Sequence, residues 1–461
     1  MIESPVTPLL PGAVAAEAGP HRRLGIAFGR RFFLLVAVGL VWAIPAAADP
    51  RLGFTMLAWD LLVLTAWAVD LAALRRARPI RVRRSFRAPV ALSVESTVDL
   101  TLENGSSEPV SATIVDAVPS GLREAPPSVD LQVAAHASAT ASYAIRPGAR
   151  GDVAIGDAYL RCHGPLRLAE RWLRAAIAQT VRVYPNLDEA RRDAALLARS
   201  RQIAVEKRRA RHPGAGREFD RLREYREGDD IRDVCWTASA RRGKLVTRTY
   251  QAERSQTVWL VLDCGRLMRA RIGTLTKLDY AVNAALSLAQ VALYSGDRVG
   301  LLAYGREVRH RVPAARGAAH LRALIEQLSA VAEEVAEADH LQAAGRLLSD
   351  QKRRALIVWL TDLAETAMTP EVVEAASRMT VRHVVLFVVI GQPDLQAMAA
   401  REPVDETAMF QAAAAQEVLH RRELLLARLR ERGVLALEAD SATLSPTIVN
   451  SYLAIKERNR L

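Results

Sequence analysis

Carboxylates that follow buried strands are the residues of this chain best placed to do chemistry. Asp263 directly follows one short apolar run, and Thr361 and Asp362 end a second one. In sheets built from alternating strands and helices, ligands bind beyond the carboxyl ends of the strands. Together with Asp229 and Asp230 from another part of the chain, these carboxylates would allow metal-dependent hydrolysis.

The rest of the sequence offers little other chemistry. It contains no Ser-His-Asp order, no HExxH and no GxxxxGK[ST] loop. Its three cysteines, Cys162, Cys235 and Cys264, are far apart and have no CxxC spacing. This spacing argues against a zinc site or a disulfide framework and suits a reducing compartment.

Residues 256–461 are expected to position Asp263 and Asp362. Short continuous apolar runs alternate there with stretches of helical periodicity, which is typical of a doubly wound α/β sheet with buried parallel strands. Residues 408–432 are expected to form an amphipathic helix that packs on the core. The expected strands are 258–262, 298–303, 355–361, 382–390 and 434–438, with a helix at 276–295.

The most distinctive stretch, residues 216–241, alternates charges of both signs densely. Gly228 permits a turn, and Asp229 or Asp230 can cap a helix. We interpret the stretch as a cross-linked structural segment in preference to a catalytic one. Helical spacing predicts one apolar face made of Ile231, Val234, Cys235 and Ala238. The candidate interaction residues are Glu218, Phe219, Arg223, Glu224, Tyr225, Gly228, Asp229, Asp230, Arg232, Trp236 and Arg241.

Residues 85–185 alternate apolar and polar side chains in short runs separated by turn clusters. This pattern predicts a small all-β sandwich-like domain, which would serve as a spacer or a docking surface. Residues 186–255 then join it to the α/β part. They begin with a linker helix at 187–212 that is crowded with Arg and Lys and end with the charged segment.

Two hydrophobic runs near the N-terminus predict a transmembrane hairpin over residues 30–76. Residues 32–48 carry no charge, and residues 52–74 carry only Asp60 and Asp70. Runs of about 20 apolar residues match the hydrocarbon core of a bilayer. We expect Asp70 to be interfacial and Asp60 to make a helix-packing hydrogen bond, because two helices alone form no transport path.

Arginines flank both outer ends of this hairpin. The positive-inside rule therefore places both ends, including a tail of residues 1–29, in the cytoplasm. A cleaved signal peptide ending near residues 46–48 is the alternative, and it leaves the rest of the chain on the same side. The arginines also account for much of the net charge of +12, so no nucleic-acid partner is expected. The arginines that flank the hairpin are Arg22, Arg23, Arg30, Arg31, Arg75, Arg76, Arg78, Arg81, Arg83, Arg84 and Arg87.

The charged segment and the order of the parts resemble one bacterial family. The pattern G-x-E-F-x-x-L-R-E-Y-x-x-G-D-D-x-R-x-h-x-W-x-A-x-A-R over residues 216–241, followed by a strand ending at Asp263, is similar to the bacterial domain-of-unknown-function family fifty-eight. So is the order of two membrane helices, a β module, this motif and a von Willebrand factor A-like domain. The resemblance implies a membrane-associated protein that cooperates with a MoxR-type AAA+ ATPase in assembling or activating other proteins.

The same resemblance implies a metal site whose ligands are partly lost. Von Willebrand factor A domains often hold Mg²⁺ through D-x-S-x-S after the first strand, a Thr and a further Asp, since a hard cation prefers oxygen ligands. Here Gly265 and Leu267 fill the two hydroxyl positions, and Ala338 stands where the Thr is expected. The remaining candidates are Asp263 and Asp362, with Thr361 and Asp339 nearby.

We therefore expect a degenerate metal-ion-dependent adhesion site with no cofactor. One hypothesis is that Arg266, or another protein cation, neutralises Asp263 and Asp362. In the alternative, Asp263 caps the following helix and Arg266 faces water. Weak Mg²⁺ binding is the third interpretation.

Three functions follow from these features. The favoured one is a non-enzymatic, membrane-tethered interaction protein of the bacterial inner membrane, with its other domains in the cytoplasm and the strand-end face, including Arg266 and Asp339, turned to a partner. The second is a metal-dependent hydrolase or nuclease. The third is a nucleic-acid or lipid binder that uses the basic flanks.

Overall fold

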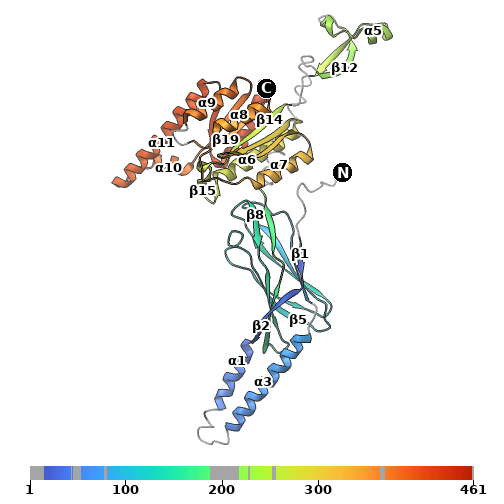
Figure 1. Ribbon diagram of the computed structural model, residues 1–461, viewed down its shortest axis with the longest axis vertical. Coiled ribbons are helices and arrows are strands. Elements are labelled where there is room, and N and C mark those ends of the chain that lie inside the picture. Colours follow the sequence, from blue (N-terminus) through green and yellow to red (C-terminus); the bar gives the residue numbers. More distant parts are fainter. Residues whose placement is uncertain are drawn as a thin grey trace. The chain divides into compact units, whose positions relative to one another are not determined.

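The computed structural model describes residues 15–42, 44, 53–76, 80–186, 218–226, 229–251, 256–363 and 369–458 (Figure 1). They belong to two compact units that divide after Tyr184. The expected linker helix at 187–212 and Gly228 lie outside the described residues.

The first unit contains the expected all-β module, with two larger sheets and one pair of strands among its described residues. Buried and partly exposed positions alternate along its strands, as expected for strands that cover a core on one face. One sheet has the order β1 (Ala16–Ala18), β3 (Ile80–Phe86), β4 (Ser96–Asn104), β7 (Ser138–Ile145). The other has the order β2 (Pro20–Phe28), β10 (Ala169–Ala175), β9 (Ala158–His163), β5 (Val110–Asp116), β6 (Ser128–Val133), and β11 (Gln179–Val183) pairs with β8 (Gly151–Ile155).

Residues expected to form an N-terminal tail are instead part of this module. β1 pairs with β3, and β2 pairs with β10 along its length, both antiparallel. The expected boundaries at 1–29 and 85–185 are therefore wrong, because the module takes strands from both sides of the hydrophobic segment. Sequence patterning missed this because β2 holds His21, Arg22 and Arg23 beside its apolar residues.

A buried ion pair joins the two larger sheets. Arg84 of β3 donates to both carboxylate oxygens of Asp116 of β5, and neither residue is exposed. Its remaining N–H groups reach the carbonyls of Ile177 and Gly156, both at 2.8 Å, and the Tyr143 hydroxyl donates to Asp116 at 2.6 Å. Every group of the pair is thus hydrogen-bonded, as a buried charge requires. Arg84 therefore belongs to the core of the module, whereas the charge count had assigned it to the membrane flank.

The hydrophobic segment forms two helices that lie side by side at one end of the module (Figure 1). α1 spans Arg30–Gly39 and continues as a short 3₁₀ turn, η1 (Leu40–Trp42), whereas α3 spans Gly53–Arg76. Within the described residues, only the stretch Gly53–Leu74 is long and apolar enough to cross a membrane. The expected two-helix hairpin is therefore not confirmed, because the described part of the first helix is too short.

Close packing and one hydrogen bond hold α1 against α3. The Trp59 indole N–H donates to the carbonyl of Leu35 at 2.9 Å. A side chain at Gly39 would meet the Trp59 ring at 2.7 Å, so only glycine allows this approach. The helix-packing hydrogen bond expected of Asp60 is thus made by its neighbour, and Asp60 Oδ1 is buried without a hydrogen-bond partner in the described part of the chain.

Asp70 fixes α3 to the β module. Its carboxylate accepts the backbone N–H groups of Leu166, Leu168 and Ala169, each at 2.8 Å, and its side chain is buried. These donors belong to the turn between β9 and β10. The expectation of an interfacial Asp70 stays a prediction. The structure adds that its carboxylate satisfies a turn that has no other acceptor for these groups among the described contacts.

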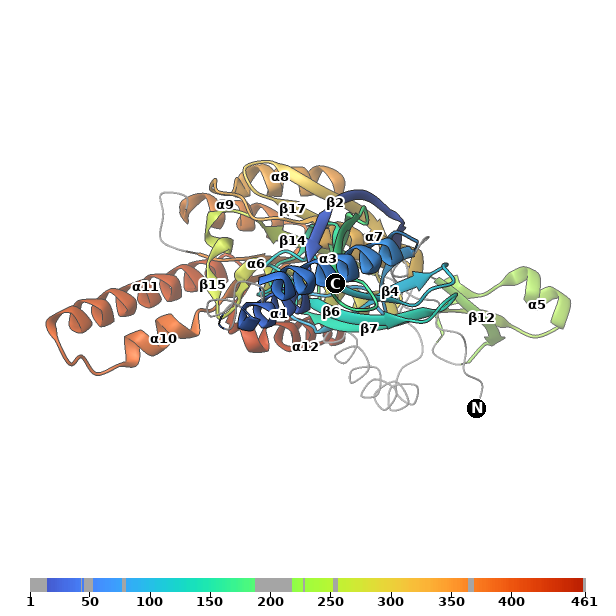
Figure 2. The same cartoon turned by 90° about the horizontal axis from the view of Figure 1, so that it is seen from below.

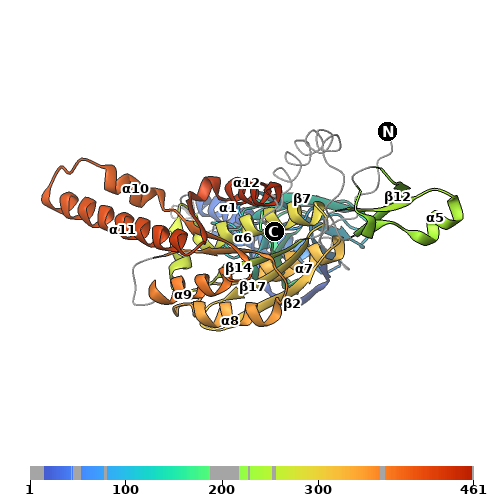
Figure 3. The same cartoon turned by 90° about the horizontal axis from the view of Figure 1, so that it is seen from above.

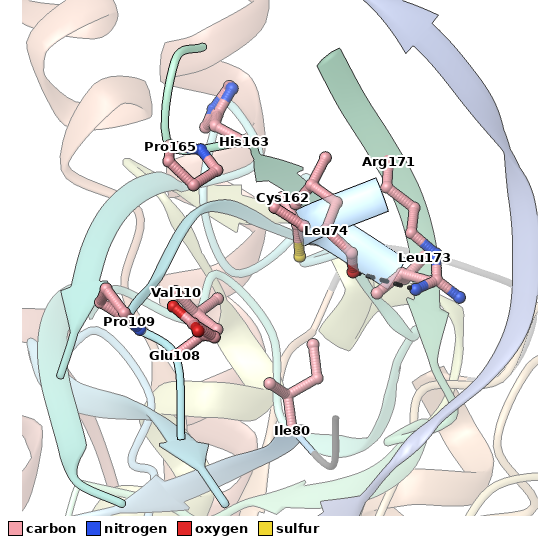
Figure 4. A pocket seen from close by; sticks show the side chains of 11 residues that line it. Leu74, Ile80, Glu108, Pro109, Val110, Cys162, His163, Pro165, Arg171 and Leu173 are labelled. Atoms are coloured by element: carbon pink, nitrogen blue, oxygen red, sulfur yellow. Dashed lines mark hydrogen bonds between the residues drawn. The ribbon is translucent and has the colours of Figure 1, made fainter. Parts of the chain in front are cut away.

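A small cavity lies where the end of α3 meets the module (Figure 4). Its volume of about 30 Å³ is that of one water molecule. Arg171 reaches across it to the carbonyl of Leu74 at 3.5 Å. Burial raises the pKa of the Cys162 thiol, which also lines the cavity, to about 11. The cavity is therefore a packing feature of the junction.

The second unit carries the expected doubly wound α/β sheet. In the described residues the strand order is β18-β17-β14-β19-β20-β21, and all neighbours are parallel except β18 and β17. The strands are β14 (Thr257–Asp263), β17 (Arg298–Tyr304), β18 (Val308–Ala315), β19 (Leu356–Thr361), β20 (Val384–Ile390) and β21 (Leu435–Ala439).

Helices cover both faces of this sheet (Figure 3). One face holds α6 (Lys277–Tyr294), α7 (Ala318–Ala330) and α12 (Leu444–Glu457). The other holds α8 (His340–Asp350) and α9 (Thr369–Thr380), which pack on Trp259, Trp359 and Phe387. Two further helices, α10 (Pro393–Ala400) and α11 (Glu406–Glu431), lie side by side (Figure 2). The first part of α11 extends away from the sheet, and its last turns pack on the core through Leu425, Leu426 and Leu429.

We predict that Asp70→Ala and Gly164→Ala each destabilise the first unit. The first change leaves three buried N–H groups without an acceptor, and the second places a Cβ against the Asp70 carboxylate. Each should lower the free energy of unfolding by about 2 kcal/mol or more. Thermal unfolding of the detergent-solubilised chain measures this, together with proteolysis of the turn at 164–169.

Gly148→Ala is the matched control, because the nearest atom to its added Cβ lies 3.8 Å away. It should leave the melting temperature and the proteolytic pattern unchanged. Equal melting temperatures for Gly164→Ala and Gly148→Ala would show that the contact between Asp70 and the turn does not hold α3.

Candidate functional site

The carboxyl ends of β14 and β19 bring the first two candidate residues together. The strands are parallel neighbours, so Asp263 and Thr361 end at the same edge of the sheet. The Thr361 hydroxyl donates to Asp263 Oδ2 at 2.5 Å, and the backbone N–H of Gly265 donates to Oδ1 at 2.7 Å. Burial raises the pKa of Asp263 above its usual range. Asp263 is thus a buried acceptor that organises its own loop.

Asp362, one residue further on, is held between two protein cations. Lys277 Nζ lies 2.6 Å from Oδ2, and Arg422 Nη2 lies 2.9 Å from Oδ1. The backbone N–H of Leu363 also donates to Oδ1 at 2.8 Å. All three charged side chains are at least nine-tenths buried. Both oxygens of the carboxylate are therefore committed to donors from the protein.

Each cation is itself held by further contacts. Lys277 is the first residue of α6, where the helix dipole disfavours a positive charge, so Asp362 compensates an unfavourable position. Its ammonium also donates to Gln392 Oε1 at 3.2 Å. Arg422 lies on α11 and bridges Asp362 to Glu438 of β21 at 2.9 Å. The cluster thus joins the first turn of α6, the loop after β19, α11 and β21.

The residues at this edge do not fit a bound Mg²⁺ ion. Asp362 is neutralised, and Asp263 is bound by Thr361 and Gly265. A side chain added at Gly265 would lie 2.9 Å from the backbone and Cβ of Ala338, so a serine cannot replace it without displacing the facing loop. In the described residues, no group of three or more His, Cys, Asp or Glu side chains is arranged to hold a metal ion.

Of the other two strand-end candidates, Arg266 is exposed, as one of the two interpretations expected, and Asp339 caps a helix. Arg266 forms an exposed ion pair with Glu337 at 2.6 Å and does not contact Asp263 or Asp362. The hypothesis of a neutralising cation therefore applies to Asp362, but with Lys277 and Arg422 as the cations. Asp339 caps α8 by accepting the N–H of Gln342 at 2.8 Å.

Sequence reasoning missed Lys277, Arg422 and a buried aromatic group beside Asp263. The Tyr304 hydroxyl lies 2.8 Å from His340 Nδ1 and accepts the Trp359 indole N–H at 2.6 Å. Burial lowers the pKa of His340. One signal was available for Lys277, since a lysine at the first position of an expected helix is unfavourable unless an acid faces it. Arg422 gave no such signal within its helix.

The charged segment forms a small structure of its own. β12 (Glu218–Glu224) pairs antiparallel with β13 (Val246–Gln251), and the 3₁₀ turn η3 (Ile231–Asp233) and α5 (Trp236–Arg242) lie between them. The expected single helix from Ile231 to Ala238 is wrong, because Val234 is extended and bridges to Thr247. The expected capping is found, since the Asp230 side chain accepts the N–H of Arg232 at 3.0 Å.

The other motif residues divide into paired and exposed side chains. Arg223 pairs with Asp229, whose pKa is lowered first by the backbone N–H of Arg226, and Glu224 pairs with Lys244 at 3.3 Å. In β12, Glu218 pairs in register with Gln251 and Phe219 with Tyr250. The indole of Trp236 and the side chain of Ile231 are about two-thirds exposed. Tyr225 is partly buried, and Arg232 and Arg241 are exposed.

Comparison with known proteins supports part of the family resemblance. Residues 221–405 match the family described as "Protein of unknown function DUF58". An uncharacterised protein of Mycobacterium tuberculosis is 29% identical over 152 residues, which cover 32% of this chain and 48% of that protein. The chain thus matches about half the length of this curated relative.

Three solved structures are similar to part of this chain at low sequence identity. The conserved hypothetical protein BatB from Bacteroides thetaiotaomicron is 12% identical and covers 44% of this chain and 100% of that one, with a TM-score of 0.29. An aerotolerance-related membrane protein from Bacteroides fragilis is 13% identical and covers 43% of this chain and 98% of that one, with a TM-score of 0.28. The von Willebrand factor domain of a pili tip protein from Porphyromonas gingivalis is 9% identical and covers 45% of this chain and 96% of that one, with a TM-score of 0.32.

We predict that Asp362→Asn destabilises the α/β domain strongly. The change leaves Lys277 and Arg422 buried with one carboxylate fewer. The free energy of unfolding should fall by about 3–5 kcal/mol. Urea unfolding followed by tryptophan fluorescence reports the change, because Trp259 and Trp359 are buried in neighbouring strands.

Glu374→Gln provides the control, since it removes an exposed i,i+4 pair with Arg378. Its effect should stay below about 0.5 kcal/mol. A loss for Asp362→Asn no larger than that of the control would mean that the Asp362 cluster does not stabilise the domain.

We also predict that the wild-type chain shows no saturable heat on calorimetric titration with Mg²⁺ and no change in melting temperature with millimolar Mg²⁺. The reason is that the ammonium of Lys277 and the guanidinium of Arg422 already bind both oxygens of Asp362. Micromolar binding that disappears in Asp263→Ala would contradict this.

Proposed function

We propose that this chain is a membrane-anchored, non-enzymatic interaction protein that binds a protein partner through the strand-end face of its α/β domain. The observation that carries the proposal is the neutralisation of Asp362 by Lys277 and Arg422. A carboxylate held in this way is neither a metal ligand nor a general base at neutral pH. The metal-dependent hydrolase therefore becomes the weaker candidate.

The first unit supports anchoring with both ends of the hydrophobic segment on one side of the membrane. β2 precedes α1 and β3 follows α3, and both strands belong to the same β module. The segment between them therefore leaves the module and returns to it, which supports placing both of its ends on one side of the membrane. Arg30 and Arg31 are exposed at the start of α1, which favours the cytoplasmic side. Cleavage near residue 48 would remove β2 and its pairing with β10.

The proposed partner is a MoxR-type AAA+ ATPase or a client of that ATPase in the bacterial inner membrane. This part of the proposal rests on the resemblance of the charged motif to its family and on the match of residues 221–405. The exposed Trp236 and Ile231 of the motif are further candidates for contact with the partner, because both are large apolar side chains open to solvent.

The test is site-specific photo-crosslinking in intact membranes. A photoreactive residue at Val335, which is exposed beside the loop after β14 at the strand-end edge, should capture an AAA+ ATPase or its client. The same residue at Val381 should not, because Val381 is exposed just before β20 begins, at the opposite edge of the sheet. Equal capture from both positions would reject the strand-end face, and repeated absence of any ATPase would reject the partner.

A further inference from the structure

A cleft of about 490 Å³ opens beyond the strand ends of the α/β domain. One wall is the 3₁₀ turn η4 (Arg266–Arg269), and the other is formed by α10 and α11. Four basic side chains line the cleft, against one carboxylate, Asp362. They are Arg266, Arg269, Lys277 and Arg422. Because Lys277 and Arg422 neutralise Asp362, the cleft presents positive charge between low-dielectric walls.

Arg269 is the cation of this cleft that is free to bind a ligand. Its side chain is exposed, and in the part of the chain that the structure describes it contacts no carboxylate. Arg266, at the opening of the cleft, is about half exposed and forms an ion pair with Glu337. A guanidinium in this position suits a planar carboxylate, which it can bind through two parallel hydrogen bonds.

The cleft continues into an apolar ridge on α11. Val418 and Leu395 line the cleft itself. Phe410, Ala414, Val418 and Arg422 follow each other at four-residue steps and so form one ridge of the helix. Phe410 is 62% exposed and Val418 is 41% exposed, so the ridge is open to solvent within the described residues. From Phe410 to Arg422 it is about 18 Å long.

We propose that the cleft binds an acidic side chain of a peptide segment from a partner protein, and that the apolar neighbours of this side chain lie along Val418 and Phe410. The inference rests on the proposed function and names the chemistry that the strand-end face recognises. A small anion would need only the cleft. The ridge beside it explains why the ligand is a peptide: the acid contacts Arg269, and apolar residues cover the exposed side chains of α11.

The test uses the full chain in detergent and a displayed library of random short peptides. Selected peptides should share an Asp or Glu next to apolar residues. Arg269→Glu should weaken their binding by about tenfold or more, because it replaces attraction by repulsion. Arg271→Glu is the matched control. Arg271 is equally exposed and two residues away, but it does not line the cleft.

Two further measurements make the result specific. Phe410→Ser should weaken the selected peptides severalfold while leaving the melting temperature unchanged, since Phe410 is largely exposed. Peptides in which the acid is exchanged for Lys should bind Arg269→Glu better than wild type. Selected peptides without an acid, or equal losses in Arg269→Glu and Arg271→Glu, would overturn the proposal.

The headgroup of an anionic lipid is the alternative ligand for this cleft. If nanodiscs containing phosphatidylglycerol displace the peptides and Arg269→Glu abolishes their own binding, the cleft is a headgroup site and the peptide proposal fails. The proposed function fails separately, when no partner is crosslinked from residue 335. A partner that is crosslinked with unchanged yield in Arg269→Glu would leave the proposed function standing and remove only the acidic-peptide inference.

Discussion

The strand-end edge of the α/β domain depends on one buried ion cluster, Asp362 between Lys277 and Arg422. Burying three charges is costly, and the cost is offset only when each is paired and hydrogen-bonded. Here both oxygens of Asp362 have donors, the ammonium also reaches Gln392, and the guanidinium also reaches Glu438. The cluster fixes α6 and α11 to the sheet and leaves excess positive charge in the adjoining cleft.

The sheet could be predicted from the sequence because buried parallel strands are continuous apolar runs. The expected strands 258–262 and 298–303 lie within Thr257–Asp263 and Arg298–Tyr304, and the expected helix 276–295 matches Lys277–Tyr294 within one residue at each end. The antiparallel strand β18 was not predicted. Its sequence VRHRVPAA lies at the edge of the sheet and has none of the continuous apolar character of its neighbours.

The candidate site was predictable only in part, for a physical reason. Asp263 and Thr361 end parallel strands, so their proximity follows from the topology. Lys277 and Arg422 are 85 and 60 residues from Asp362 along the chain, and no local pattern reports such a contact. The same holds for Arg84, which the charge pattern assigned to the membrane flank and the fold buries against Asp116. A sequence shows that a charge is present, but the partner that it meets is set by the packing.

A carboxylate neutralised by protein cations differs from a metal site in how binding there is controlled. A divalent ion can leave, so a metal-dependent face responds to the concentration of that ion. Lys277 and Arg422 are part of the fold and cannot be exchanged. Recognition at this edge then depends on ionic strength and on the charge of the ligand, because exposed cations such as Arg269 are screened by salt. Under the proposed function, release of a partner would come from the partner itself or from a protein that remodels it, and an AAA+ ATPase is the proposed candidate for that step.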